Sequence, residues 1–410
     1  MKLFLCSFIF LLSLNATCLG QSTDLHMSKG QSKVDIPFDF QNNFIIIKVL
    51  FNNFFPLKFI LDTGAEHTIL TQREITDLLH VNYQREFKVI GSDMQTELIA
   101  YLASGIRFQL GDLTARNRSI LVLDEDYFRF DEFAGIDVHG ILGADFLRRF
   151  IVKINYRKQI ITFYNPQNYT PPPASKYEEI PIEIVRNKPY IWTKTQFNKD
   201  TSLNLKLLYD TGASLATLLY TDTHSDLKLP ESVIRSNIAI GLGGYLEGFI
   251  GRLPNIEIGP FELQDVVANY QELPPNIDSS YINDRNGIVG NILMQRFIVI
   301  IDYFKSKIYL TPNRTFKQKF DYDRSGMTIV AAGKALGQYR VLNVIKDSPA
   351  DEAGVLPNDI LRSINGVPTA LISLGEIINK LQKKVGKRTR LTIKRGEEKI
   401  KVTFRLRKLI

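Results

Sequence analysis

The segments "LDTGAEHTIL" (residues 61–70) and "YDTGASLATL" (residues 209–218) place one tetrapeptide, Asp-Thr-Gly-Ala, at two points of the same chain, 148 residues apart. An apolar run, "LKFIL" or "LKLLY", comes directly before each aspartate. Each run predicts a buried strand that ends in a loop. Because an ionised carboxylate at the end of a buried strand is costly without partners, the pattern indicates two aspartates that are used together.

A second pair of similar segments follows the first. "HGILGADFLRRFIVKINY" starts at His139 and "NGIVGNILMQRFIVIIDY" starts at Asn286, and both contain Gly-Ile-x-Gly and Arg-Phe-Ile-Val-x-Ile-x-Tyr. The aspartate and the second glycine of Gly-Ile-x-Gly are 81 residues apart in the first copy and 80 in the second. This period is far longer than that of a solenoid, so the chain is predicted to hold two duplicated lobes, residues 31–166 and 176–313.

Within each lobe the pattern is mainly that of short alternating strands broken by Gly, Asn and Asp turns. One short helix is expected after each Gly-Ile-x-Gly, over residues 144–150 and 291–297. The segment "YTPPPAS" (residues 169–175) predicts a stiff linker between the lobes.

Two carboxyls brought to short range cannot both ionise, so they share a proton and their titrations separate. The ionised partner, Asp62 or Asp210, can then take a proton from a bound water, while the protonated partner donates to a carbonyl oxygen. This chemistry hydrolyses amides without a covalent intermediate. Short hydroxyls and glycines beside the aspartates are expected to support the dyad, namely Thr63, Gly64, Thr211 and Gly212.

With these motifs each lobe resembles one subunit of a retroviral-type (retropepsin-like) aspartic protease. "LDTGAEHT" is similar to the family's aspartate loop and "GILGADFL" to its later glycine turn and helix. The resemblance implies two β-barrel lobes that form an intramolecular pseudo-dimer. Each lobe is too short for the larger lobes of the pepsin-like enzymes, so the retroviral-type fold is favoured. The resemblance also implies flaps at residues 89–97 and 239–248. The residues expected to bind substrate from loops and flaps are Ala65, Glu66, Ala213, Ser214, Gly91, Ser92, Gly241, Gly243 and Gly244.

The two lobes depart from each other at these positions. The flap of lobe 1 has Ser92-Asp93-Met94 where lobe 2 has Leu242-Gly243-Gly244, and Glu66 corresponds to Ser214. The two flaps are therefore expected to close unequally.

Residues 321–410 resemble a PDZ domain (α+β), most clearly in "DSPADEAGVLPNDILRSINGVP" (residues 347–368). Such domains bind extended peptides or carboxyl termini by adding a strand to a sheet edge. The resemblance places the groove between the strand that starts near Met327 and the helix at residues 373–384, with Arg324 as an aid in binding a carboxylate. The residues expected to contact the peptide are Ser325, Gly326, Met327, Thr328, Ile329 and Ile377.

Residues 1–20 have the pattern of a signal peptide, with one Lys and then an apolar core too short to span a bilayer. Cleavage after Gly20 would remove both cysteines, Cys6 and Cys18. Two alternatives are lipid attachment at Cys18 and a buried N-terminal strand. The prediction is an exported protein that is periplasmic, on the cell surface or secreted.

Composition excludes several other classes. The chain has a net charge of +8, which divides into 21 basic against 9 acidic residues (+12) from Arg314 onward and 30 against 34 (−4) before it. This basic excess is read as a solvated face, and no motif suggests nucleic acid. The five histidines show no His-Glu-x-x-His spacing, so neither a metal nor another cofactor is expected. Since the fused lobes supply both aspartates, a monomer is expected.

Three hypotheses follow for the function. The first is an exported aspartic endopeptidase whose PDZ domain binds peptide or protein partners. The second is a non-catalytic protein that holds peptides on the same fold. The third makes the PDZ domain the main functional unit, as an anchor in an envelope assembly.

Overall fold

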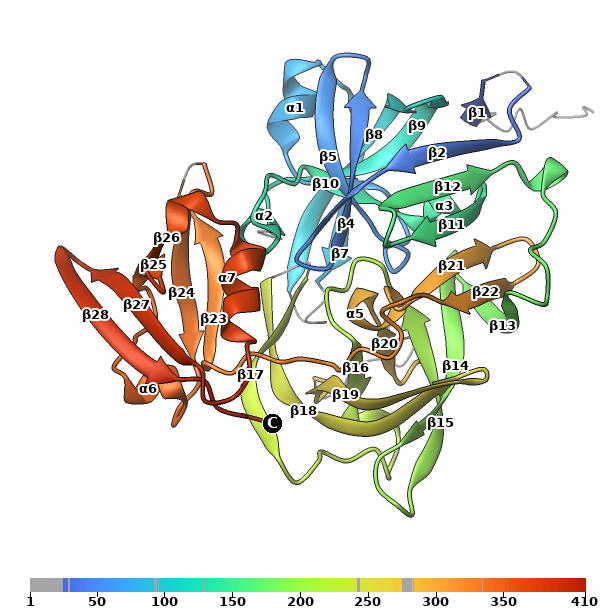
Figure 1. Cartoon of the computed structure of the whole chain (residues 1–410). Coiled ribbons are helices and arrows are strands. Elements are labelled where there is room, and N and C mark those ends of the chain that lie inside the picture. Colours follow the sequence, from blue (N-terminus) through green and yellow to red (C-terminus); the bar gives the residue numbers. More distant parts are fainter. Residues whose placement is uncertain are drawn as a thin grey trace, which may run out of the picture.

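The fold is mainly β and consists of two lobes and a smaller α+β domain, which confirms the predicted fold class. The computed structural model describes residues 25–410 apart from 29, 92, 93, 95, 128, 129, 242, 243, 275–281, 283 and 334. Figure 1 shows lobe 1 in blue, cyan and green, lobe 2 mostly in lighter green and yellow, and the PDZ domain in orange and red. The predicted signal peptide lies outside the described residues. Among those described, no helix is long and apolar enough to cross a membrane.

The described residues of lobe 1 form strands in two sheets, one of which is shared with lobe 2, and three short α-helices. Its strands are β1 (Leu25–Met27), β2 (Lys33–Pro37), β3 (Asp39–Gln41), β4 (Phe44–Phe51), β5 (Phe55–Leu61), β6 (Ile69–Leu70), β7 (Tyr83–Ile90), β8 (Glu97–Leu110), β9 (Leu113–Leu123), β10 (Gly140–Leu142), β11 (Ile151–Asn155) and β12 (Ile160–Tyr164). Its helices are α1 (Arg73–Leu78), α2 (Phe130–Ala134), α3 (Ala144–Leu147) and the 3-10 turn η1 (Pro166–Asn168).

Lobe 2 repeats this plan. Its strands are β13 (Glu178–Val185), β14 (Lys188–Gln196), β15 (Ser202–Tyr209), β16 (Thr217–Tyr220), β17 (Val233–Gly241), β18 (Gly244–Ile258), β19 (Phe261–Gln271), β20 (Gly287–Val289), β21 (Phe297–Asp302) and β22 (Lys307–Pro312). Its helical turns are η2 (Thr221–Thr223) and α5 (Asn291–Met294).

In both lobes the aspartate follows a buried strand that is paired with a parallel neighbour. β5 pairs with β10 and β15 with β20, each in parallel register. The backbone N–H of Asp62 donates to the carbonyl of Leu142 at 3.0 Å, and that of Asp210 donates to the carbonyl of Val289 at 3.0 Å. The Gly-Ile-x-Gly segments therefore fix the main chain at the point where each aspartate leaves its strand.

The lobes are joined by a continuous antiparallel sheet with the order β2-β12-β11-β21-β22-β13. Its central pair crosses between the lobes, with Lys153 of β11 opposite Ile300 of β21. Three strands come from each side, and the repeated Arg-Phe-Ile-Val segments supply the two central ones. This shared sheet gives the two lobes one core.

The predicted helices at residues 144–150 and 291–297 are shorter than expected. α3 and α5 end at Leu147 and Met294, because Phe150 and Phe297 are buried where the chain turns into the shared sheet. Helices α1 and α2 were not predicted.

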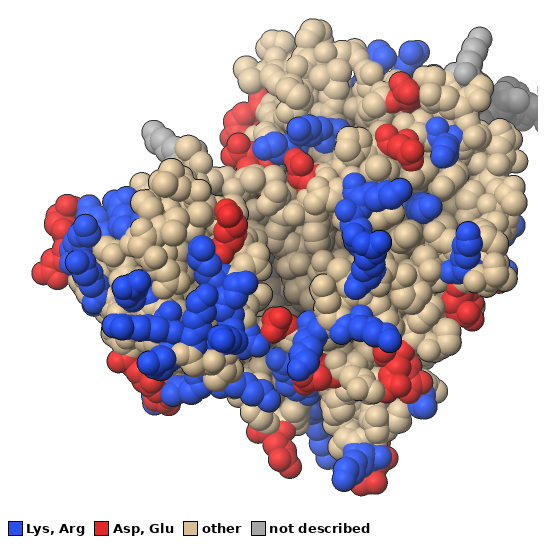
Figure 2. Space-filling model, in the orientation of Figure 1, with Lys and Arg blue, Asp and Glu red and all other residues tan. Residues whose placement is uncertain are grey.

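The PDZ domain contains β23 (Met327–Ala332), β24 (Gln338–Val344), α6 (Pro349–Glu352), β25 (Ile360–Ile364), β26 (Val367–Pro368), η3 (Thr369–Leu371), α7 (Leu374–Leu381), β27 (Arg388–Arg395) and β28 (Glu398–Arg405). Helix α7 starts with a capping box between Ser373 and Glu376. In the sheet order β23-β24-β25-β27-β28, β23 is an edge strand of the described sheet. The Lys and Arg side chains of this basic domain gather on its surface (Figure 2).

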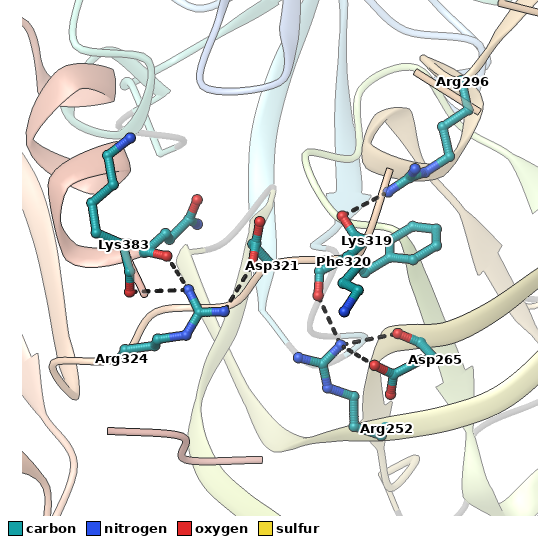
Figure 3. Close-up of polar contacts among 9 residues, drawn as sticks. Arg252, Asp265, Arg296, Lys319, Phe320, Asp321, Arg324 and Lys383 are labelled. Atoms are coloured by element: carbon teal, nitrogen blue, oxygen red, sulfur yellow. Dashed lines mark hydrogen bonds and ion pairs between the residues drawn. The ribbon is translucent and has the colours of Figure 1, made fainter. Parts of the chain in front are cut away.

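Arginines fix the segment that leads from lobe 2 to the PDZ domain (Figure 3). Arg252 donates to the carbonyl of Phe320 at 2.7 Å, and Arg296 donates to the carbonyl of Lys319 at 3.4 Å. Arg296 also donates to the carbonyl of Gln318 at 2.5 Å. The guanidinium of Arg296 also lies 3.6 Å from the ring centroid of Phe320. The connection is therefore packed onto lobe 2.

Candidate active site

Two threonines hold the aspartate loops of the two lobes together. The N–H of Thr63 donates to Oγ1 of Thr211 at 3.0 Å, and the N–H of Thr211 donates to Oγ1 of Thr63 at 3.1 Å. Each hydroxyl in turn donates to a carbonyl of the other lobe, Thr63 to Tyr209 at 2.6 Å and Thr211 to Leu61 at 2.7 Å. Both threonines are fully buried, so these four bonds set the distance between the loops.

The structure brings the carboxyls of Asp62 and Asp210 together, each packed against the glycine of the other lobe's loop. Oδ1 of Asp62 accepts from the N–H groups of Gly64 at 2.7 Å and Ala65 at 2.9 Å. Oδ1 of Asp210 accepts from the N–H of Gly212 at 2.8 Å. A Cβ on Gly64 would lie 2.6 Å from Cγ of Asp210, and a Cβ on Gly212 would lie 2.4 Å from Cγ of Asp62. Only glycine leaves room for the facing carboxyl.

Burial raises the pKa of both carboxyls. For Asp62 the negative charge of Asp210 and their mutual hydrogen bond raise the pKa further, so that it stands well above its usual range. For Asp210 burial raises the pKa, while its hydrogen bonds and the positive charges of Arg285 and Lys188 oppose the rise. The pair therefore keeps one proton at a pH where an ordinary aspartate is ionised.

A buried asparagine supports the dyad from beneath. Nδ2 of Asn291 donates to the carbonyl of Thr211 at 2.6 Å and to that of Asn43, in lobe 1, at 2.8 Å. Its Oδ1 accepts from the hydroxyl of Tyr156 at 2.8 Å, and that hydroxyl is 3.3 Å from the hydroxyl of Tyr209. Sequence reasoning missed this residue, although Asn291 stands where the other copy has Ala144. A polar residue in one copy where the other copy has alanine was the signal that could have identified Asn291.

An aspartyl protease family model matches residues 47–146 and, a second time, residues 194–291. Each match contains one Asp-Thr-Gly loop and one Gly-Ile-x-Gly turn. Both lobes are thus similar to the aspartyl protease family. A PDZ domain model matches residues 340–395 in the tail.

Single relatives match only part of the chain. A probable CtpA-like serine protease of Staphylococcus saprophyticus subsp. saprophyticus is 26% identical over 151 residues, 36% of this chain and 30% of that protein. Another, of Staphylococcus haemolyticus, is 32% identical over 100 residues, 23% of this chain and 20% of that protein. This chain therefore spans less than a third of these curated relatives.

Solved structures that resemble the chain include an aspartic proteinase from Irpex lacteus, with 16% identity and a TM-score of 0.45 over 70% of this chain and 99% of the other. Basic 7S globulin from soybean has 9% identity and a TM-score of 0.44 over 70% of this chain and 97% of the other.

The predicted flaps of the two lobes lie at hairpin turns. Residues 89–97 connect β7 with β8, where the N–H of Gly91 donates to the carbonyl of Thr96 at 2.8 Å. Residues 239–248 form the end of the hairpin β17–β18, which contains Gly241 and Gly244. Ser92 and Gly243 lie outside the described residues.

The predicted loop residues lie next to the dyad in both lobes. The carbonyl groups of Ala65, Glu66 and Ala213 accept from the N–H groups of Ala144, Asp145 and Asn291. Ser214 is half-buried beside them. Among the described residues, no group of three His, Cys, Asp or Glu side chains is arranged to hold a metal ion.

The predicted carboxylate-binding loop of the PDZ domain is occupied by a side chain of the same chain. The carboxylate of Asp323 accepts from the N–H groups of Ser325 at 3.0 Å and Gly326 at 2.5 Å, and from the hydroxyl of Ser325 at 2.8 Å. The N–H of Met327 donates to that same hydroxyl oxygen at 3.2 Å. These are the donors that were expected to meet the carboxylate of a peptide.

The expected role of Arg324 in binding a carboxylate is not supported. Its guanidinium donates to Asp321 at 2.8 Å and to the carbonyls of Gln382 and Lys383 at the end of α7. The side chain is thus held at the helix end, where carbonyls without helical partners attract a cation. The remaining predicted groove residues are Thr328, half-buried, and Met327, Ile329 and Ile377, which are buried in the core of the PDZ domain.

Asp323→Asn is expected to remove a pH dependence of stability. Burial raises the pKa of Asp323 to about 6, against the hydrogen bonds from Ser325 and Gly326 that lower it. A carboxyl with a raised pKa binds its proton more tightly when folded, so stability falls as pH rises from about 4 to about 6, by on the order of 1–2 kcal/mol. Thermal unfolding of wild type and variant between pH 4 and pH 7 measures the effect. The variant should show the shallower decline, and parallel curves would contradict the assignment.

Proposed function

We propose that this protein is an exported aspartic endopeptidase. The observation that carries the proposal is the pair of desolvated carboxyls, Asp62 and Asp210, each of which lies against the glycine of the other lobe's Asp-Thr-Gly loop. Strongly perturbed carboxyls beside each other are typical of acid–base catalysis.

In the proposed reaction a water molecule lies between the carboxyls and attacks the carbonyl carbon of a peptide bond. Asp210, whose ionised form is favoured by Arg285 and Lys188, takes a proton from this water, while Asp62 donates its proton to the carbonyl oxygen. The resulting tetrahedral intermediate collapses when Asp210 passes its proton to the amide nitrogen, Asp62 takes back a proton from a hydroxyl of the intermediate, and the carbon–nitrogen bond breaks. No bond forms between protein and substrate.

The test is cleavage of a mixed peptide library by the wild type and by Asp62→Asn. Cleavage by the wild type alone supports the aspartic mechanism. A serine mechanism is the second candidate, because the two staphylococcal relatives are named as probable serine proteases. A serine-reactive phosphonate should leave the wild-type activity unchanged, and inactivation would favour that candidate. If no peptide is cleaved under any condition, the non-catalytic peptide-binding alternative gains support.

We further propose that the chain is exported and works as a monomer with polypeptide substrates. The signal-peptide pattern of residues 1–20 supports export, and the sheet shared by the lobes supports a single chain that supplies both aspartates. Sequencing the mature N-terminus separates cleavage after Gly20 from lipid attachment at Cys18. Light scattering of active fractions tests the monomer. The PDZ domain is proposed to bind polypeptide. The contacts that this domain makes within the chain indicate which polypeptide it binds.

A further inference from the structure

The PDZ domain packs against lobe 1 through helix α2. This helix lies next to β23, the strand to which a peptide would be added (Figure 1). A Cβ on Gly135, directly after α2, would lie 3.3 Å from Cβ of Leu374, the first residue of α7. The side chain of Asn42 donates to the carbonyls of Phe133 and Ala134 and lies beside Gly375 of α7. Lobe 1 therefore reaches the end of the groove where α7 begins.

The other end of the same groove is occupied by Asp323. Its carboxylate takes the N–H groups of Ser325 and Gly326, and the N–H of Arg324, beside them, donates to the carbonyl of Leu381 at the end of α7. Both ends of the groove are thus engaged within the chain. A free carboxyl terminus would have to displace Asp323 to reach these amides.

Helix α2 also connects the PDZ domain with the flap of lobe 2. The carboxylate of Glu132 lies 3.6 Å from the guanidinium of Arg340, on β24, and accepts from the hydroxyl of Tyr245 at 3.4 Å. Tyr245 follows Gly244 at the flap end of β18, and its ring lies 5.6 Å from that of Phe133. One acidic side chain therefore meets a cation of the PDZ domain and a tyrosine of the flap.

Two more contacts join the PDZ domain to this hairpin. Nδ2 of Asn343 donates to the hydroxyl of Ser236, on β17, at 3.4 Å. Ile410 is buried in an apolar cluster that also contains Ile238 and Leu246 of the hairpin. The PDZ domain is thus in contact with both strands of the lobe 2 flap.

We propose that the PDZ domain binds its own protease lobes, and that Glu132 is a positioning residue that links Arg340 to Tyr245 and so holds the flap of lobe 2 over the dyad. This inference rests on the proposed protease function. A two-stranded hairpin is only marginally stable by itself, so a free flap loses conformational entropy when it closes over a substrate, and this cost weakens binding. A flap that Glu132 already holds in place loses less entropy on binding, so KM is lower.

The experiment measures kcat and KM of the full chain on one short fluorogenic peptide and one long protein substrate, both chosen from those the wild type cleaves. The variants are Glu132→Gln, Arg340→Ala and the double variant. The matched control is Arg235→Ala, which breaks the ion pair with Glu247 on the same hairpin, where both side chains are exposed (75% and 67%, against 23% for Arg340 and 21% for Glu132).

Loss of one charged contact at a partly buried site should raise KM about five- to tenfold with kcat nearly unchanged. The short and long substrates should be affected alike, and Arg340→Lys should restore part of the loss. Because both residues act through one link, the double variant should lose no more than either single variant. An unchanged KM, an equal effect of Arg235→Ala, or an effect on the long substrate alone would overturn the proposal, the last in favour of substrate delivery by the PDZ domain.

A second measurement separates this proposal from the proposed catalytic function. In hydrogen exchange, Arg340→Ala should increase deuterium uptake in residues 233–241 and 244–250, and Arg235→Ala should not. If Asp62→Asn stays active while Arg340→Ala shows the expected increase in exchange of the flap, the aspartic mechanism is wrong and the link through Glu132 is supported. If Asp62→Asn is inactive and the flap is unchanged in Arg340→Ala, only the link fails.

Discussion

Asp62→Asn and Asp210→Asn are each expected to lower kcat by about three orders of magnitude or more, because general acid–base catalysis contributes about 10²–10⁴-fold for each group. An amide cannot take a proton from water, and it cannot exchange roles with the remaining carboxyl. Neither variant should unfold the protein, since the loops are held by Thr63 and Thr211 rather than by the carboxyls. Steady-state kinetics together with thermal unfolding checks both statements. Turnover within tenfold of wild type in either variant would contradict the dyad.

The pH dependence of the wild type follows from the same pair. Catalysis needs one proton on the dyad, and burial and the charge of Asp210 raise the pKa of Asp62 well above its usual range. Activity should therefore persist above the pH at which an ordinary aspartate ionises and fall as pH rises through this raised pKa. The stability contributed by this carboxyl has the same sign, present at low pH and lost as pH rises. A rate that climbs steadily into alkaline pH would require a different mechanism.

Gly212→Ala is expected to be nearly as damaging, with kcat reduced roughly 100-fold or more, as a displacement of about 1 Å at a reacting group can cause. The new methyl group would lie 2.4 Å from Cγ of Asp62, so the facing carboxyl or the loop has to move. Gly64→Ala should behave alike, because its Cβ would lie 2.6 Å from Cγ of Asp210.

Gly337→Ala is the matched control for these two variants. It adds the same methyl group where the nearest atom, the carbonyl oxygen of Ala335, is 3.9 Å away, and its kinetics should match wild type. A Gly212→Ala variant with wild-type kcat would show that the carboxyls do not approach as closely as the structure has them.

The sequence was sufficient for the local features of the dyad. The apolar runs before Asp62 and Asp210 specify buried strands. A glycine beside each carboxyl leaves room for the facing carboxyl, and a threonine supplies the hydroxyl that bonds to the other lobe. The duplication also predicted that both aspartates come from one chain, because two similar lobes are expected to pair about an axis. The α7 helix and its capping box likewise depend on neighbours within four residues, Ser373 and Glu376 among them.

Contacts between distant segments were decided by the tertiary structure alone. Asn291 reaches Asn43 across 248 residues, and no local pattern states that its amide will lie under the loop of Thr211. Arg324 looked available for a carboxylate, but the end of α7, 58 residues later, supplies the carbonyls that hold it. Asp323 by itself resembles a turn residue, and only the fold shows that it accepts from the N–H groups of Ser325 and Gly326, in the loop predicted to bind a peptide.

Glu132 is the clearest case. In the sequence it is one charge in a short unpredicted helix, whereas the fold places it between Arg340 and Tyr245. The strands and the dyad could be read from the sequence because their determinants are near neighbours along the chain. The docking of the PDZ domain on the flap could not, because it depends on how three folded units pack, and packing is set by the shapes of whole surfaces.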